Sequence, residues 1–64
     1  MPIIRVEMLA GRTPQQKEEY ANELTKITSE VLNCSGDAVE IIFMEIKSEN
    51  WARDGKLHGP ATQT

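Results

Sequence analysis

The 64-residue sequence predicts an α/β fold, in which a β-α-β unit is followed by a short C-terminal hairpin. Three observations predict it: an alternating apolar segment near the N-terminus, a helical apolar pattern after it, and a nearly continuous apolar run after the helix. Two strands joined by a long helix are most simply parallel, because antiparallel neighbours need only a tight turn. We therefore expect two parallel strands with one amphipathic helix on one face of their sheet.

The first strand is predicted at residues 2–9, where apolar residues alternate along the chain. One of its faces is apolar and the other is mixed: the first carries Ile4, Val6 and Met8, and the second carries Ile3, Arg5, Glu7 and Leu9. Residues 10–12 end the strand and lead into the helix.

The helix is predicted from Pro14 to about Leu32. Thr13 can cap it, and Gln16 lies three residues after the cap, as in a capping box. Proline also suits the first helical position. Apolar residues then recur at helical spacing and form one stripe, which consists of Tyr20, Leu24, Ile27 and Val31. The helix is expected to end near Asn33.

The second strand is predicted at residues 39–47, whose almost continuous apolar run is typical of a strand buried on both faces. Residues 48–50 end it, and residues 51–58 are expected to form a short turn or hairpin with His58 exposed. Residues 58–64 are expected to be a loosely held tail of a single domain that spans residues 1–64.

A chain of this length needs additional stabilisation, because it buries only about 60% of the surface that its unfolded form exposes. Cys34 is the single cysteine and cannot form an internal disulfide. A structural zinc site normally has four Cys or His ligands, and His58 is the only histidine. One helix covers only one face of the sheet, so we expect partner subunits to cover the other.

The charge balance excludes some partners. Seven basic and ten acidic residues give a net charge of −3, which argues against a nucleic-acid binder. No run approaches the roughly 20 apolar residues of a membrane span, and the N-terminus lacks the features of a signal peptide. We therefore expect a cytoplasmic protein with no membrane or nucleic-acid partner.

Pro2 directly follows the initiator methionine, so removal of Met1 would leave it with a free secondary amine. A terminal amine in water has a pKa of about 8, and burial or neighbouring cations lower it toward the value of about 7 that suits a general base. Alternatively, Pro2 only begins a strand, where its missing N–H does no harm. Position alone leaves both interpretations open.

The N-terminal Met-Pro, the segment LAGRTPQQK at residues 9–17, and Trp51 before Asp54 and Gly55 together resemble the 4-oxalocrotonate tautomerase family. The resemblance extends from residue 2 to about residue 57, and its specific part is the proline together with Gly11 and Arg12 before the helix. It implies an isomerase without cofactor or metal. It also implies dimers that join their sheets into one four-stranded layer, and a homohexamer built as a trimer of dimers.

The resemblance also implies roles for individual residues. Pro2 would act as general base and acid, moving a proton between the enol oxygen and a carbon of a conjugated 2-oxo acid. Arg12 would bind a substrate carboxylate through two hydrogen bonds and would favour the neutral form of Pro2. Trp51 stands where the family often has an aromatic residue that closes the pocket. Arg12 lies roughly 30 Å from Pro2 along an extended strand, so we expect a site shared between subunits.

Two positions depart from the family pattern. Glu40 stands where the best-studied tautomerases have a second arginine, and its carboxylate would repel a diacid substrate. Arg53 either restores a cation near the pocket or is an exposed turn residue. Arg53 also stands where related trans-3-chloroacrylate dehalogenases carry a water-activating glutamate, although Asp54 is adjacent and Glu40 is a conceivable substitute.

The sequence therefore predicts a tautomerase, similar to 2-hydroxymuconate tautomerase, that interconverts enol and keto forms of a small anionic 2-hydroxydienoate or 2-oxo acid. The predicted site residues are Pro2 for catalysis and Arg12, Trp51, Arg53 and Glu40 for substrate binding. Two alternatives remain open. One is a dehalogenase or hydratase of 3-haloacrylate-like acids, and the other is a non-catalytic partner subunit of a mixed oligomer, which Glu40 keeps open.

Overall fold

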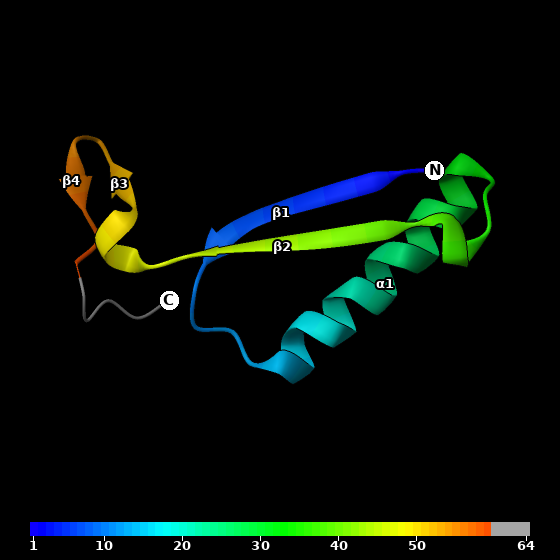
Figure 1. Cartoon of the computed structure of the whole chain (residues 1–64), viewed down its shortest axis with the longest axis horizontal. Coiled ribbons are helices and arrows are strands. Elements are labelled where there is room, and N and C mark those ends of the chain that lie inside the picture. Colours follow the sequence, from blue (N-terminus) through cyan, green and yellow to red (C-terminus); the bar gives the residue numbers. More distant parts are fainter. Residues whose placement is uncertain (60–64) are drawn as a thin grey trace.

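The computed structural model describes residues 1–59 (Figure 1). The elements follow in the order β1 (Ile3–Leu9), α1 (Pro14–Leu32), the 3₁₀ helix η1 (Gly36–Ala38), β2 (Glu40–Ile46), the 3₁₀ helix η2 (Ser48–Asn50), β3 (Ala52–Arg53) and β4 (Lys56–Leu57). The predicted β-α-β unit and the C-terminal hairpin are confirmed. Each of the two long strands is shorter than predicted, by no more than one residue at either end.

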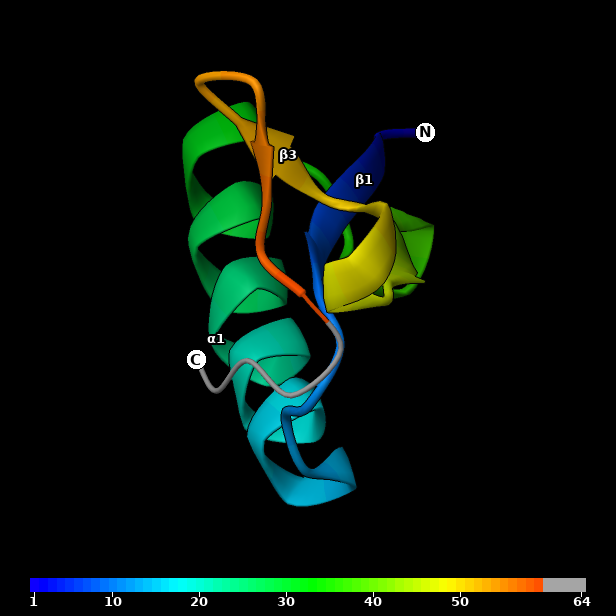
Figure 2. The same cartoon turned by 90° about the vertical axis from the view of Figure 1, so that its left-hand side faces the viewer.

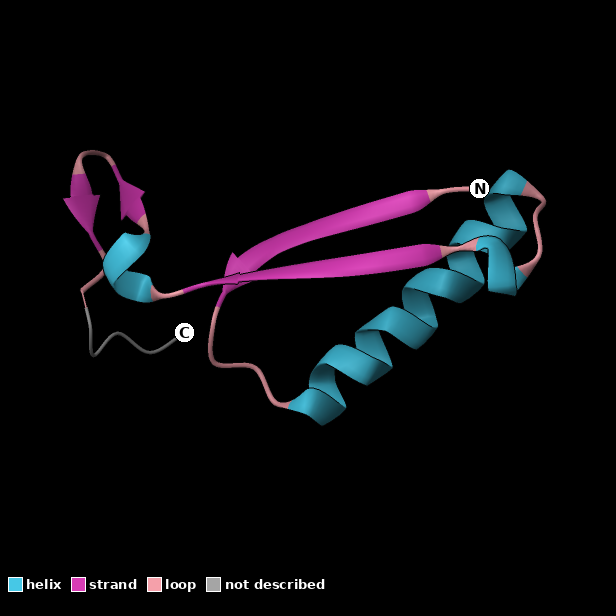
Figure 3. Ribbon diagram, viewed as in Figure 1, coloured by secondary structure: helices cyan, strands magenta, loops and turns pink. Residues whose placement is uncertain are grey.

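Strands β1 and β2 form a parallel pair whose register runs from Ile3 opposite Glu40 to Leu9 opposite Ile46. The helix α1 returns the chain along the sheet, so that β2 begins beside the start of β1 (Figure 3). Backbone hydrogen bonds extend the pair at both ends. The N–H of Glu40 donates to the Pro2 carbonyl at 3.0 Å, and the N–H of Ala10 donates to the Ile46 carbonyl at 2.9 Å.

The predicted capping box fixes the start of α1. The backbone N–H of Gln16 donates to Thr13 Oγ1 at 3.1 Å, and the backbone N–H of Thr13 donates to Gln16 Oε1 at 3.0 Å. At the other end, Asn33 adopts a left-handed conformation with φ of 56° and terminates the helix. The helix therefore begins and ends at residues that the sequence pattern identified.

The sheet has one covered face and one open face. Residues on the face toward α1 are half-buried, namely Ile4, Val6, Met8, Ile41 and Phe43. On the open face, Ile3 is 62% exposed, Ile42 43% and Met44 44%. The prediction that the second strand is buried on both faces is therefore wrong for the single chain, because α1 covers only one side of a two-stranded sheet.

Residues 1–59 contain no fully buried side chain, so the single chain has no closed hydrophobic core. The radius of gyration is 14.6 Å, whereas a compact domain of 64 residues would have about 11 Å. The apolar residues therefore line open surfaces, which is typical of a subunit that folds with partners.

The β3–β4 hairpin stands beyond the end of β2 and packs on η2 (Figures 1 and 2). Asp54 and Gly55 form its turn with φ of 55° and 78°, and the N–H of His58 donates to the Trp51 carbonyl at 2.9 Å. His58 is half-buried and not exposed as expected, because its ring lies beside that of Trp51. In the segment expected to be a loose tail, Gly59 accepts a hydrogen bond from Ser48 Oγ. Residues 60–64 of that segment lie outside the described residues.

Candidate active site

A groove of about 230 Å³ lies beside Arg12, at the end of the sheet where β1 and β2 terminate. Arg12 comes from the loop after β1, and the other walls come from β1, from the first two turns of α1 and from β2. Apolar and aromatic groups line it together with cationic and amide groups. Its lining residues are Met8, Arg12, Gln16, Lys17, Tyr20 and Phe43.

Two contacts hold the walls of this groove in place. Lys17 Nζ contacts the Glu45 carboxylate, and the two side chains are only 27% and 34% exposed. The rings of Tyr20 and Phe43 pack at a tilt of 51° with their centroids 6.2 Å apart. Both contacts join α1 to β2. They therefore fix the first half of the helix, and the Arg12 loop before it, against the sheet.

Arg12 carries the uncompensated charge of the groove. The Lys17 ammonium is already paired with a carboxylate, whereas Arg12 is exposed and takes part in no ion pair among residues 1–59. A guanidinium can bind a planar carboxylate with two parallel hydrogen bonds. The groove therefore suits a small acid whose carboxylate contacts Arg12 and whose apolar part lies against Met8 and Phe43.

Pro2 lies at the opposite end of the sheet (Figure 1). It is half-buried and lines a second groove, of about 460 Å³, whose other wall is the last part of α1. That wall is apolar and includes Ile27, Val31 and Leu32. Within one chain, Pro2 and Arg12 therefore belong to two separate grooves.

Glu40 lies at the Pro2 end, because it opens β2 opposite Ile3 and its N–H donates to the Pro2 carbonyl. The side chain of Glu40 is exposed. The second strand therefore places a carboxylate near Pro2 of the same chain, where it adds negative charge to that end of the sheet.

Trp51 and Arg53 lie beyond the other end of the sheet. Trp51 follows η2 and is half-buried, and Arg53 lies in β3 and is exposed. Parallel strands end at the same edge, so these two residues lie at the same end of the sheet as Arg12. The structure thus separates the five predicted residues into a Pro2–Glu40 group and an Arg12–Trp51–Arg53 group.

Sequence reasoning missed several residues of the Arg12 groove. The sequence did contain a signal that Lys17 and Tyr20 lie near Arg12. Residues three apart share a helix face, and both residues follow Arg12 within the first turns of the helix. The partners of these residues, Glu45 and Phe43, lie in a distant segment, and periodicity does not reveal such contacts.

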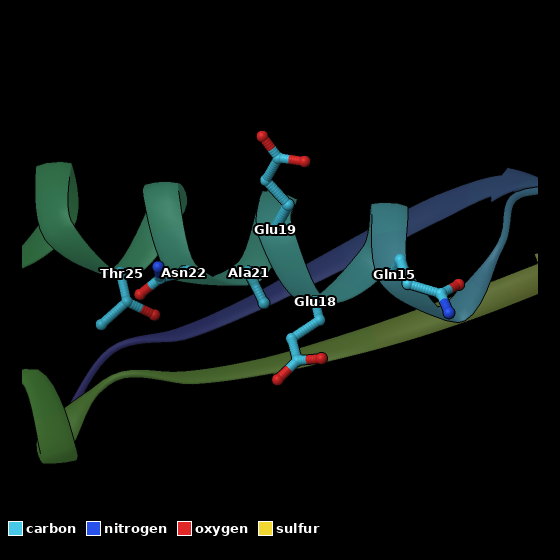
Figure 4. Close-up of a pocket in the computed structure, with 6 residues that line it drawn as sticks. All are labelled: Gln15, Glu18, Glu19, Ala21, Asn22 and Thr25. Carbon is cyan, nitrogen blue, oxygen red and sulfur yellow. The ribbon is translucent and has the colours of Figure 1, made fainter.

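A third hollow lies along α1, where Figure 4 shows six residues of this helix. Glu18 and Glu19 contribute carboxylates to it, and it contains none of the five predicted site residues. Those two carboxylates would repel an anionic substrate, so this hollow is not a candidate site. It is lined by Gln15, Glu18, Glu19, Ala21, Asn22 and Thr25.

The part of the chain that the structure describes contains neither a cluster of metal-ligating side chains nor a helix suited to cross a membrane. Residues 1–59 contain no group of three or more His, Cys, Asp or Glu side chains placed to hold a metal ion. In the same residues, no helix has the length and apolar character needed to cross a bilayer.

Comparison with known proteins agrees with this architecture. The family described as "Tautomerase enzyme" matches residues 2–60. A 2-hydroxymuconate tautomerase of Bacillus subtilis (strain 168) is 30% identical over 56 residues, which cover 88% of this chain and 90% of that protein.

Two solved structures show the same fold. A crystal structure of a 4-oxalocrotonate tautomerase homologue has a TM-score of 0.86 at 33% identity and covers 89% of this chain and 90% of its own. A heterohexameric 4-oxalocrotonate tautomerase from Chloroflexus aurantiacus J-10-fl has a TM-score of 0.84 at 28% identity. The match covers 89% of this chain and 92% of that chain. The match of the family across nearly the whole chain shows that the protein belongs to the tautomerase family.

Proposed function

We propose that the protein is a cofactor-independent keto–enol tautomerase of a small 2-hydroxydienoate or 2-oxo acid, with Pro2 as the proton-transferring group. The observation that carries this proposal is the pair of incomplete grooves. One holds a half-buried Pro2 among apolar residues, and the other holds the guanidinium of Arg12, which forms no ion pair with any described residue. The Pro2 groove would supply the amine that transfers the proton, and the Arg12 groove would supply the cation that binds the carboxylate.

The two grooves would be united by assembly. The Pro2 end of one chain would meet the Arg12 end of another, since the strand that joins them within a chain keeps them apart. The open face of the sheet provides the apolar surface for association, through Ile3, Ile42 and Met44. We therefore propose a homo-oligomer in which sheets pair edge to edge into dimers and the open faces of these dimers pack together in a hexamer.

In the proposed reaction, Arg12 holds the carboxylate beside the enol. The neutral amine of Pro2 accepts the proton of the enol hydroxyl, the carbonyl forms, and the electron pair moves to a carbon of the conjugated chain. That carbon then takes the proton from the protonated amine, so the proton count balances. The guanidinium favours the charge that develops on the acid, and the apolar walls strengthen this effect by excluding water.

The amine of Pro2 exists only when Met1 has been removed, because an acylated proline nitrogen is not basic. Met1 is 81% exposed and so is accessible to an aminopeptidase. Activity should therefore rise in proportion to the fraction of chains that lack Met1, which intact-mass measurement gives directly. Full activity in a preparation that retains Met1 would overturn the role of Pro2.

The proposal is tested by the rate of ketonisation of 2-hydroxymuconate and phenylenolpyruvate, followed by ultraviolet absorbance. Proton transfer by a positioned group contributes roughly 10²- to 10⁴-fold, so Pro2→Ala, which leaves a primary amine, should lower kcat/KM by at least about 100-fold. Pro14→Ala, which changes the proline at the start of α1, is the matched control and should retain activity. Equal rates for the Pro2→Ala and unmodified proteins would refute the proposal.

A second candidate is supported by the heterohexameric relative: the chain could be one subunit of a mixed oligomer whose other chain supplies further site residues. Glu40 near Pro2 favours this alternative, because a partner chain could then provide the missing cation. Purification of the chain alone distinguishes the two cases. A complete and active oligomer supports the homo-oligomeric enzyme, whereas an inactive product that gains activity with a related chain supports the mixed oligomer.

A further inference from the structure

The C-terminal hairpin presents two different faces. Its register pairs Ala52 with Leu57 and Arg53 with Lys56, and the bond from the His58 N–H to the Trp51 carbonyl extends the pairing by one position. Side chains alternate between the faces of a strand, so one face carries Ala52 and Leu57. The opposite face carries Trp51, Arg53, Lys56 and His58, and we call it the aromatic–cationic face.

Aromatic rings form the base of this face. The Trp51 and His58 rings lie at an interplanar angle of 32° with centroids 6.4 Å apart, and both residues are half-buried. Arg53 and Lys56 stand directly beyond them toward the turn and are exposed. The face thus combines two aromatic rings, tilted relative to each other, at its base with two cations at its tip, in a chain whose net charge is −3.

The two cations are not neutralised within the described chain. Among residues 1–59, neither Arg53 nor Lys56 takes part in an ion pair. Like charges directly opposite each other on two strands are destabilising. An anion placed between Arg53 and Lys56 would remove this repulsion and form charge-assisted hydrogen bonds with both.

We propose that Arg53 and Lys56 form a second anion-binding point, which takes the far carboxylate of a flat, conjugated dicarboxylic acid whose body lies against Trp51. This inference rests on the proposed function, since Arg12 would hold the first carboxylate. Glu40 disfavours a second carboxylate at the Pro2 end, so a diacid needs a cationic site elsewhere. The hairpin stands clear of β1 and α1 (Figure 1), and a hairpin that extends in this way would contribute to a groove formed with a neighbouring chain.

Trp51 is the only tryptophan, so its fluorescence reports on ligand binding at this face without any turnover. The assembled protein is titrated with two unreactive probes: cis,cis-muconate, a planar diacid, and sorbate, a planar monoacid. The diacid should bind at least about 10-fold more tightly, because it alone contacts both cationic points. This preference should decrease as salt screens the exposed charges.

The variants Lys56→Gln and Arg53→Gln should each weaken muconate binding by about 10-fold and leave sorbate binding within about 2-fold. Lys26→Gln removes the same charge from an exposed position on α1 and should change neither affinity. Equal effects of Lys56→Gln on both probes, or no effect on either, would overturn the proposal. Circular dichroism confirms that each variant is folded, and the second hairpin variant tests the same point independently.

The catalytic role of Pro2 and this binding point fail in different ways. Pro2→Ala protein should still prefer muconate over sorbate, because the probes are bound and not converted. A protein without tautomerase activity that keeps this preference would refute the proposed function and leave the hairpin site standing. An active enzyme with no preference between the probes would refute the hairpin site and leave the proposed function standing.

Discussion

Ile42 gives the sharpest test of the proposed assembly. It lies near the middle of β2 on the open face of the sheet, opposite Arg5, and is 43% exposed in the single chain. Complete burial of such a side chain stabilises by about 1.5–3 kcal/mol, so covering the exposed part of Ile42 contributes about 1 kcal/mol per chain. An interface between two chains buries one Ile42 side chain from each. The substitution Ile42→Ala would thus weaken this interface by about 2 kcal/mol, or about 30-fold in affinity.

Ile42→Glu should have a larger effect, because an unpaired carboxylate would have to lose its hydration in the interface. We expect this variant to lose association through the open face and to be no larger than the edge-paired dimer at micromolar concentrations in sedimentation equilibrium. No residue of the described chain is fully buried, so dissociation should also lower helix content, and the Tm of the unmodified protein should rise with protein concentration.

Asn22→Glu is the matched control, since it adds the same charge at an exposed position of α1. It should leave the mass and the dissociation constant of the oligomer unchanged. If Ile42→Glu protein kept the mass and the dilution behaviour of the unmodified protein, the open face would not be an interface, and the reasoning from exposed apolar area would be refuted.

Two further predictions concern the Arg12 groove and the hairpin turn. Loss of a charge-assisted, two-point hydrogen bond costs about 1.5–3 kcal/mol, so Arg12→Ala should raise the KM for the acid by about 10- to 150-fold in steady-state assays. Arg12→Lys should recover part of this loss, because it restores the charge without the two-point geometry. An unchanged KM in Arg12→Ala would show that Arg12 does not bind the substrate. Gly55 has φ of 78° with open space around it, so Gly55→Ala should destabilise the hairpin by about 1 kcal/mol and alter Trp51 fluorescence. Gly36→Ala, whose Cβ would meet Thr25 Cγ2 at an ordinary 3.7 Å, is the control, and equal effects of the two substitutions would contradict this account of the turn.

The sequence predicted the local structure well, because local structure depends on neighbours along the chain. The capping residues Thr13 and Gln16 identified the start of α1, and alternation identified which residues of β1 face the helix. Glycine after aspartate indicated the turn of the hairpin. The occurrence of Pro2 together with Gly11 and Arg12 in one sequence indicated the family, which the comparisons confirm.

What the tertiary structure alone decided is how the predicted residues are grouped. The sequence could not show that Lys17 is paired with Glu45 while Arg12 has no ion pair within residues 1–59, because Glu45 lies 28 residues after Lys17, in β2. Nor could it show that Arg53 and Lys56 face each other beside Trp51, since that depends on the register of the hairpin. Composition and periodicity determine which elements form, whereas the charge that a site offers to a ligand depends on contacts between distant segments.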